Sequence, residues 1–417
     1  MHEEEHKSAE EVSESKPIVG HIREKFYQSE NSRLYDEKRW LQAYRNYRGL
    51  YGPEMVFRSN EKSRVFVKVT KTKVLAAFGQ IIEVLFSSGK FPLGINPTQV
   101  PEEIPEYAHL KPKQAQAPQQ PQDPYGFKGD GREIPPGATA DMLMKNLAQE
   151  FENVGFDEGP ANVGEPQIQP AEMAAKHLEK LLHDQLEESS AITVLRHVFF
   201  EQCLLGTGIL KGPFSFDHTY HAFDTAEDEQ GNVTNIHVKK IKTVPKVEAV
   251  SCWDFYPDPN ATSINDCDYV IQRHSLNRQQ FSDLRKMPYF DDTAIDMCLE
   301  EGPNYQVRGY ESSLYNRETV ETIYKNRFEV LEYWGVVTKE MAQECGIDSD
   351  KDVININAWI CGGKVLRMVE NPFEPTRLPF MVCPYELNPY QFFGVGVPEN
   401  MEDSQQIMNG HARMAID

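Results

Sequence analysis

The stretch WDFYPDPNATSINDCDY holds the side chains with the clearest capacity for chemistry, namely the carboxylates of Asp254, Asp258, Asp266 and Asp268. Carboxylates gathered in this way can hold Mg²⁺, and a Mg²⁺ ion here would make the protein a metal-dependent nuclease. A calcium loop, in contrast, needs a glycine where Ser263 stands and a bidentate glutamate where Tyr269 stands. We favour a structural turn in which aspartate side chains bind backbone N–H groups. Divalent-dependent DNA cleavage that is lost on replacing Asp258 would favour the nuclease instead.

Three glycines in FEQCLLGTGILKGPF, Gly206, Gly208 and Gly212, bring a nucleotide-binding loop to mind. They follow a predicted helix rather than a strand, which is the wrong order for a dinucleotide fold. The phosphate-binding motif GxxxxGK[ST] does not occur in the sequence. We interpret the glycines as the end of a helix and a tight turn into a strand.

Histidine and cysteine do not form a catalytic pattern. His177, His183, His197 and His218 lie at amphipathic or edge positions without a serine or cysteine motif, which is typical of packed or solvated side chains. The seven cysteines are scattered and never form a CxxC pair, which indicates reduced thiols and no zinc site. We therefore expect no catalytic residue, no metal ligand and no cofactor, and a protein that is not an enzyme.

Composition limits the class of protein. The 417 residues carry a net charge of -21, so tight binding to a phosphate backbone is disfavoured. The most apolar run, Val74 to Phe86, is too short to cross a bilayer, and the acidic N-terminus has no apolar signal segment. One stretch differs, because Lys62 to Lys73 holds five positive residues and no acid. It predicts a short strand or extended segment with an exposed basic edge, or else a contact with DNA or with an acidic neighbouring subunit.

The order of the patterns divides the chain into six parts. We expect a disordered acidic tail at 1–20, a helical region at 21–91, a flexible insertion rich in proline and glutamine at 92–138, an α+β region at 139–327, a β-rich block at 328–390 and a helix start at 391–417.

Several elements can be placed more closely. Helices are predicted from Ser29 to about Gly49, from Val74 to Phe86 with Thr70 or Thr72 as the cap, and from Pro170 onwards with a kink at Ser189–Ser190. Strands are predicted at 209–216, 219–226, 233–250, 328–337, 353–360, 365–369 and 380–385, and short helices at 277–287 and 291–301. The last stretch passes through Gly394-Val-Gly396 and Pro398 into a helix without a C-terminal cap.

Separated segments in consistent order carry a resemblance to a known family. They are YDEKRWLQAYRNYRGLYGPE with SRVFVKVTKTKVLAAFGQIIEVLF, then FEQCLLGTGILKGPF, then VSCWDFYPDPNATSINDCDYVIQRHSLNRQQFSDL, and RLPFMVCPYELNPYQFFGVGVPENMEDSQQIMNGHARMAID. Together they resemble portal proteins of tailed bacteriophages, the head-to-tail connectors, particularly those of podophage-like viruses. The resemblance implies an elongated α+β subunit of a ring, dodecameric in the virion, with a wing, a stem and a clip. Wing and stem would occupy the chain up to about 327, the clip 328–390, and a stem or channel helix 391–417, with the C-terminal crown part missing.

The same resemblance implies the function. The ring would sit at a capsid vertex of the virion after assembly in the host cytoplasm, and viral DNA would be packaged and ejected through it. Its partners would be other copies of the chain, the terminase large subunit, the head-tail adaptor, the major capsid and scaffolding proteins, and double-stranded DNA bound without sequence preference, but no membrane. The residues that line the DNA channel stay unknown at this stage. A different virion or scaffold protein, binding acidic or proline-specific partners through its tail and insertion, is an alternative.

Overall fold

The structure, a computed structural model, describes residues 17–59, 61–89, 91–97, 170–227, 233–315, 324–347, 350–373 and 378–417. The chain forms two compact units, one from Met1–Phe91 with Gln185–Asp417 and one from Pro92–Asp184. Only 92–97 and 170–184 of the second unit are described. The predicted insertion at 92–138 lies mostly outside the described residues, and a helix that the sequence also predicts from Thr139 to about Phe151 lies wholly outside them.

The first helix, α2 (Pro17–Arg48), begins earlier than the sequence suggested. The predicted end of the disordered tail at residue 20 is therefore wrong, because residues 17–20 belong to α2. The predicted helix start at Ser29 is wrong for the same reason. Ile18, Val19 and Ile22 are buried in one apolar cluster with residues of the sheet described below. These side chains recur at helical spacing and gain stability by leaving water, which extends the helix towards the N-terminus.

The second helix, α3 (Val69–Phe86), also begins earlier than predicted. Residues 62–68 before it belong to no helix or strand, so of the two forms predicted for the basic stretch, a short strand or an extended segment, the strand is not found. Neither Thr70 nor Thr72 is the N-cap residue of the helix. The N-cap position is occupied by Lys68, whose side chain makes no hydrogen bond to the N–H groups of the first turn. The N-terminal N–H groups of α3 thus need partners from elsewhere.

The long helical stretch is broken where the sequence predicted a kink. Helix α5 (Pro170–Glu188) and helix α6 (Ala191–Leu205) are separated by Ser189 and Ser190, and Ser190 takes a left-handed backbone conformation with φ of 53°. Helix α6 ends at Gly206, also left-handed with φ of 91°, and a strand follows at once. The interpretation as a helix stop and turn into a strand is confirmed for Gly206, whereas Gly208 and Gly212 lie within the strand that follows.

Two antiparallel sheets make up the β structure. In the first, β1 (Thr207–Glu227) lies between β2 (Val233–Val250) and β8 (Phe380–Pro384). β1 is continuous where two strands were predicted, with a register shift between Lys211 and Phe214. The second sheet has the order β3-β4-β5-β6-β7. Its strands are β3 (Phe255–Pro257), β4 (Tyr269–Asn277), β5 (Arg327–Thr338), β6 (Val353–Cys361) and β7 (Lys364–Glu370).

Helices cover both faces of the five-stranded sheet. On one face the start of α2 and helix α11 (Lys339–Glu344) pack against a cluster that includes Tyr256, Tyr333 and Ile356. On the other face lie α7 (Arg278–Asp283) and α8 (Asp292–Glu301), the two short helices that the sequence predicted, with a further short helix, α9 (Gly309–Tyr315), packed against α2. Mixed helices and antiparallel sheets confirm the predicted α+β class.

A buried ion pair joins the two sheets. Lys211 of β1 donates to Glu332 of β5 at 2.5 Å, and His274 of β4 lies 2.8 Å from the same carboxylate. Burial alone would raise the pKa of Glu332, but the charge of Lys211 and the hydrogen bond from His274 lower that pKa to about 2. The carboxylate is therefore ionised at neutral pH, and its partners fix the relative position of β1 and β5.

The predicted boundary at 327/328 falls after the first residue of β5, a strand that pairs with β4 in one sheet. The strands of residues 328–390 do not form a sheet of their own. β5 to β7 belong to the second sheet, and β8 pairs with β1 in the first. The β-rich block thus folds together with the residues before it, and its assignment to a clip stays a prediction.

Candidate functional site

Two glycine loops cross at the point where the C-terminal segment enters the fold. A Cβ atom on Gly206 would lie 2.5 Å from the carbonyl oxygen of Gly394, and one on Gly394 would lie 2.6 Å from the carbonyl oxygen of Gly206. Thr207 Oγ1 accepts a hydrogen bond from Gly394 N at 2.9 Å, and Tyr385 N donates to Gly206 O at 2.8 Å. Only glycine allows this backbone approach, so both predicted glycine motifs serve one packing contact.

Helix α12 (Val397–Asn400) starts directly after this crossing, with Pro398 in its first turn as predicted. Arg39 of α2 binds helix α12 through a bidentate ion pair with Glu399, at 3.0 and 2.8 Å. Its guanidinium also donates to Gly394 O at 3.1 Å. Bidentate pairing of this kind fixes orientation as well as distance. The N-terminal helix α2 therefore positions the start of the C-terminal helices.

Helix α13 (Glu402–Ile416) binds the backbone of the extended basic segment through its amide side chains. Gln405 Oε1 accepts from Thr70 N at 3.0 Å and from Thr70 Oγ1 at 2.8 Å, and Gln405 Nε2 donates to Val67 O. Asn409 Oδ1 accepts from Val67 N at 2.8 Å, and Asp417 Oδ1 accepts from Ser63 N at 2.8 Å. We call Gln405 and Asn409 the amide clamp. It supplies the cap that α3 lacks, from a helix more than three hundred residues away in sequence.

Replacing Gln405 with leucine is expected to lower the free energy of unfolding by about 2–3 kcal/mol, because the N–H and the hydroxyl of the buried Thr70 both lose their acceptor. Amide hydrogen exchange should accelerate at Thr70. Gln406→Leu is the matched control, since Gln406 is exposed and, among the described residues, bonds to Glu402 at 3.3 Å. It should leave exchange at Thr70 unchanged. Equal exchange rates in the two variants would contradict the capping role.

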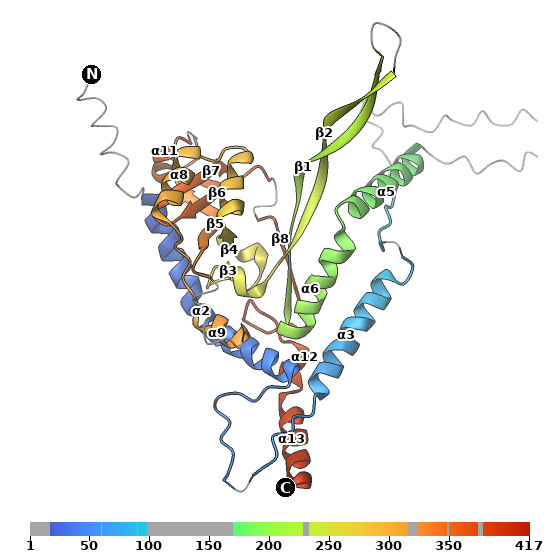
Figure 1. Ribbon diagram of the computed structural model, residues 1–417, viewed down its shortest axis with the longest axis vertical. Helices are drawn as coiled ribbons and strands as arrows, with labels where there is room; N and C mark the ends of the chain where they lie inside the picture. The colour runs from blue at the N-terminus through green and yellow to red at the C-terminus, as the bar shows by residue number, and fades with distance from the viewer. Residues whose placement is uncertain are drawn as a thin grey trace, which may run out of the picture. The chain divides into compact units, whose positions relative to one another are not determined.

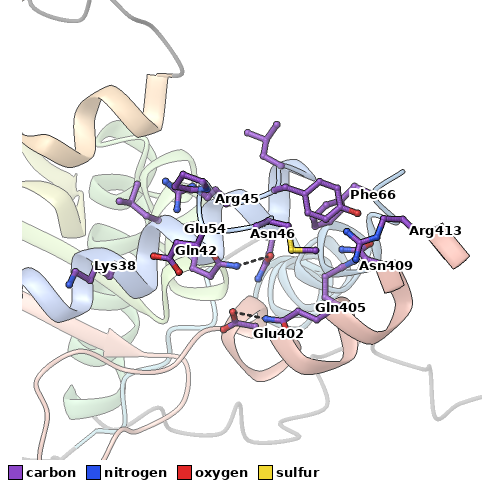
Figure 2. Close-up of a pocket in the computed structure, with 17 residues that line it drawn as sticks. Lys38, Gln42, Arg45, Asn46, Glu54, Phe66, Glu402, Gln405, Asn409 and Arg413 are labelled. Carbon is purple, nitrogen blue, oxygen red and sulfur yellow. Dashed lines mark hydrogen bonds between the residues drawn. The ribbon is translucent and has the colours of Figure 1, made fainter. Parts of the chain in front are cut away.

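A cavity of about 540 Å³, lined by both polar and apolar side chains, lies beside the clamp, between α2, the loop after it and α13 (Figure 2). Its lining includes three cationic side chains, Lys38, Arg45 and Arg413, and two acidic ones, Glu54 and Glu402. The amides of Gln42 and Asn46 bond to each other at 3.3 Å on its α2 side.

The basic stretch keeps its charges in water although its backbone is held by α13. All five cations of residues 62–73, listed as Lys62, Arg64, Lys68, Lys71 and Lys73, are exposed. The predicted exposure of these basic side chains is therefore confirmed, whereas the predicted short strand is not found. Exposed lysine and arginine can neutralise phosphates or carboxylates of a partner.

The aspartate cluster is a turn of the kind favoured from the sequence. Asp258 Oδ1 accepts from Asn260 N at 3.0 Å and Asp258 Oδ2 from Asp268 N at 3.4 Å. Asp266 bonds to the Ser263 hydroxyl at 2.7 Å instead. Burial raises the pKa of Asp254, which weakens its ability to serve as an anionic ligand. Across the ranges that the structure describes, no group of three His, Cys, Asp or Glu side chains is placed to hold a metal ion.

The histidines of interest are spread over different elements. His177 and His183 lie on α5 and His197 lies on α6, while the side chain of His218 is outside the described residues.

Burial raises the pKa of the thiol of Cys203 to about 11, so this thiol is not activated as a nucleophile. No helix in the described part of the chain has both the length and the apolar character of a bilayer span.

Comparison with protein-family models decides the family. The model described as phage SU10 portal protein matches residues 168–417. The chain belongs to this phage portal protein family. Portal proteins are virion components that connect head and tail, and as a class they are structural rather than enzymatic. A comparison with curated proteins gave no match.

The match to the portal family begins just before α5 and includes both sheets, the glycine crossing and α13. Helices α2 and α3 precede the matched residues, yet Trp40 and Val74 belong to the same apolar cluster as Leu204 and Phe393 of the matched part. The N-terminal helices are thus integral to the portal subunit rather than an appended module.

Proposed function

We propose that the chain forms a homo-oligomeric ring, dodecameric in the virion, at a capsid vertex, and that double-stranded DNA passes through it during packaging and ejection. The family match supports a portal subunit, and the exposure pattern of α13 supports self-association. ATP hydrolysis would occur in the terminase large subunit, which docks on the ring, and the head-tail adaptor would dock later.

The main support for the proposal comes from helix α13, whose polarity is inverted: polar side chains are buried and large apolar side chains are exposed. Its polar residues Gln405 and Asn409 are 1% and 4% exposed, whereas Ile407 and Met414 are 60% and 69% exposed. A helix normally places its apolar face inward and its polar face in water. Here the inward face binds backbone groups, and the apolar face is left for a contact outside the described residues. A neighbouring copy of the portal subunit fits this contact, since subunit interfaces have apolar centres.

Two further observations fit the proposed partners. The exposed basic stretch 62–73 gives an otherwise acidic subunit one surface that can contact DNA phosphates without sequence preference. The segment after β8 exposes Leu387 and Tyr390, side chains that favour protein contacts and suit the docking of the terminase or adaptor at a clip formed by 328–390. The major capsid and scaffolding proteins would contact the outside of the ring.

Mass photometry and averaged electron micrographs of the purified chain test the proposal. Twelve copies of the 47.8 kDa chain give particles of about 570 kDa, with a central hole in top views. Self-association should depend on protein concentration and on the exposed face of α13. Monomers that persist at high protein concentration would contradict the ring.

A further inference from the structure

Three cationic side chains in the cavity beside the amide clamp have no acidic partner. Lys38 and Arg45 of α2 and Arg413 of α13 line this cavity, and none of them forms an ion pair with a described residue. Arg39 of the same helix α2 differs, because it pairs with Glu399 at 2.8 Å. Since Arg45 and Arg413 are half-buried, an anion that binds beside them gains more than it would in open water.

Two buried amides add unused hydrogen-bond donors to the same cavity. Asn46 of α2 is 5% exposed and Asn409 of α13 is 4% exposed. Asn409 Oδ1 accepts from Val67 N at 2.8 Å, and Asn46 Oδ1 accepts from Gln42 Nε2 at 3.3 Å. These bonds assign the oxygen of each amide, so its Nδ2 group is the remaining donor. Neither Nδ2 group has an acceptor within the ranges that the structure covers. Buried donors are normally hydrogen bonded, which predicts an acceptor atom in the cavity.

Aromatic rings hold the guanidinium group of Arg413 at the edge of the cavity. Its Cζ atom lies 5.2 Å from the ring centre of Tyr51 and 5.4 Å from that of Phe57. Its Nη1 atom is buried and has no hydrogen-bond partner in the described part of the chain. Ring contacts fix the plane of a guanidinium but do not use its N–H groups, which bind the paired oxygens of a carboxylate or phosphate.

Two acids also line the cavity, but they leave its cations in excess. Glu54 is exposed, and Glu402 accepts from Gln406 Nε2 at 3.3 Å. Three cations against two acids give the cavity a charge of +1, whereas the whole chain has a net charge of -21. The cavity is therefore a local exception in an acidic protein, and its charge favours an anion.

Volume and apolar side chains indicate the size of this anion. The cavity of about 540 Å³ lies within the range of sites that hold small molecules. Leu50, Met55 and Phe66 contribute apolar surface to it. A carboxylate or phosphate group by itself would fill only a small part of the volume, so the cavity suits an anionic group attached to an apolar or aromatic body.

We propose that this cavity binds a small organic anion whose carboxylate or phosphate group contacts Arg45, Arg413 and the amides of Asn46 and Asn409. The proposal goes beyond the ring and does not depend on it, because every residue that carries it belongs to one copy. Figure 1 shows α12 at the end of α2, with α13 continuing from it. A ligand that binds α2 and α13 at once connects the two helices and stabilises the attachment of α13.

Titration of the full chain with inorganic phosphate and with succinate tests the proposal, because they present the two oxyanion groups separately. We expect at least one of them to raise the midpoint of thermal unfolding in a saturable way, with a dissociation constant of about 1 mM or lower. Sodium chloride at the same ionic strength should give no saturable shift. Hydrogen exchange should slow in residues 42–55 and 405–413 when the anion is bound.

Variants of the cavity arginines locate the binding. Arg413→Gln and Arg45→Gln should each raise the dissociation constant by about tenfold or more, because each removes a charged donor. Arg64→Gln is the matched control, since the guanidinium of Arg64 also lies over the ring of Phe57, at 4.0 Å, but Arg64 does not line the cavity. This control should bind the anion like the unmodified chain. Circular dichroism should show the same fold for all three variants.

Absence of saturable binding by either anion, or equal binding in all three variants, would overturn the proposal. Displacement of the anion by a short DNA duplex would assign the cavity to a backbone phosphate and would overturn the small-molecule assignment. If a cavity variant does not fold, exchange in the unmodified chain decides, because protection confined to residues outside 42–55 and 405–413 would place the anion elsewhere. Ring formation is measured separately, so a chain that binds the anion but stays monomeric contradicts only the proposed function.

Discussion

Replacing Arg33 with methionine is expected to lower the free energy of unfolding by about 3–5 kcal/mol. The guanidinium group of Arg33 is buried and donates to three backbone carbonyls, those of Cys252 at 3.1 Å, Trp253 at 3.0 Å and Phe255. It also forms an ion pair with Glu37 at 3.0 Å. Methionine has a shorter, uncharged side chain that makes none of these bonds, so the carbonyls and the carboxylate lose their partner.

The reason for the large effect is the position of Arg33. It connects α2 to the turn that leads into β3, and its guanidinium lies 3.8 Å from the ring centre of Tyr256. Denaturant titration should show the loss directly. Arg23→Met on the same helix is the control, because Arg23 is exposed and its side chain donates to Gly362 O within the described part of the chain. Its loss should cost no more than about 1 kcal/mol. Equal stability of the two variants would show that α2 does not depend on this anchor.

The sequence predicted those elements that short-range patterns define. Gly206 after an apolar helical run, Ser189–Ser190 within a helix and Pro398 after a glycine loop each have a local conformational cause, and the structure places each feature there. The strands from Phe328 to Val369 were also recognisable, because buried alternation and a glycine turn at Cys361–Lys364 are local signals.

Features that depend on distant partners were not accessible in the same way. The start of α2 at Pro17 is decided by burial of Ile18 against strands more than two hundred residues later. The capping of α3 by Gln405 has no local signal, since the threonines beside it looked like better caps. The candidate site was therefore foreseen only as a glycine loop, a helix and a basic stretch. The sequence of α13 offered one sign that these parts meet. Its apolar stripe is incomplete, and the amides of Gln405 and Asn409 lie on one side of the helix.

The glycine crossing leads to the second large effect, for Gly206→Ala. A methyl group there would lie 2.5 Å from Gly394 O and 2.7 Å from Gly396 N, both of them backbone atoms that cannot turn aside. The left-handed conformation adds about 1 kcal/mol, and displacing packed backbone adds about 1–3 kcal/mol more. We expect a total loss of about 2–4 kcal/mol in the free energy of unfolding, measured by denaturant titration.

A control separates the two parts of this loss. Gly346 also has a positive φ, of 86°, but a Cβ atom there meets nothing within 4 Å. Gly346→Ala should therefore cost only the conformational part, about 1 kcal/mol. Because Gly206 contacts the loop that starts α12, hydrogen exchange in residues 394–405 should accelerate in Gly206→Ala and stay unchanged in Gly346→Ala. Equal losses in the two variants would mean that the loops do not need their close approach, and would contradict this role of the glycine crossing.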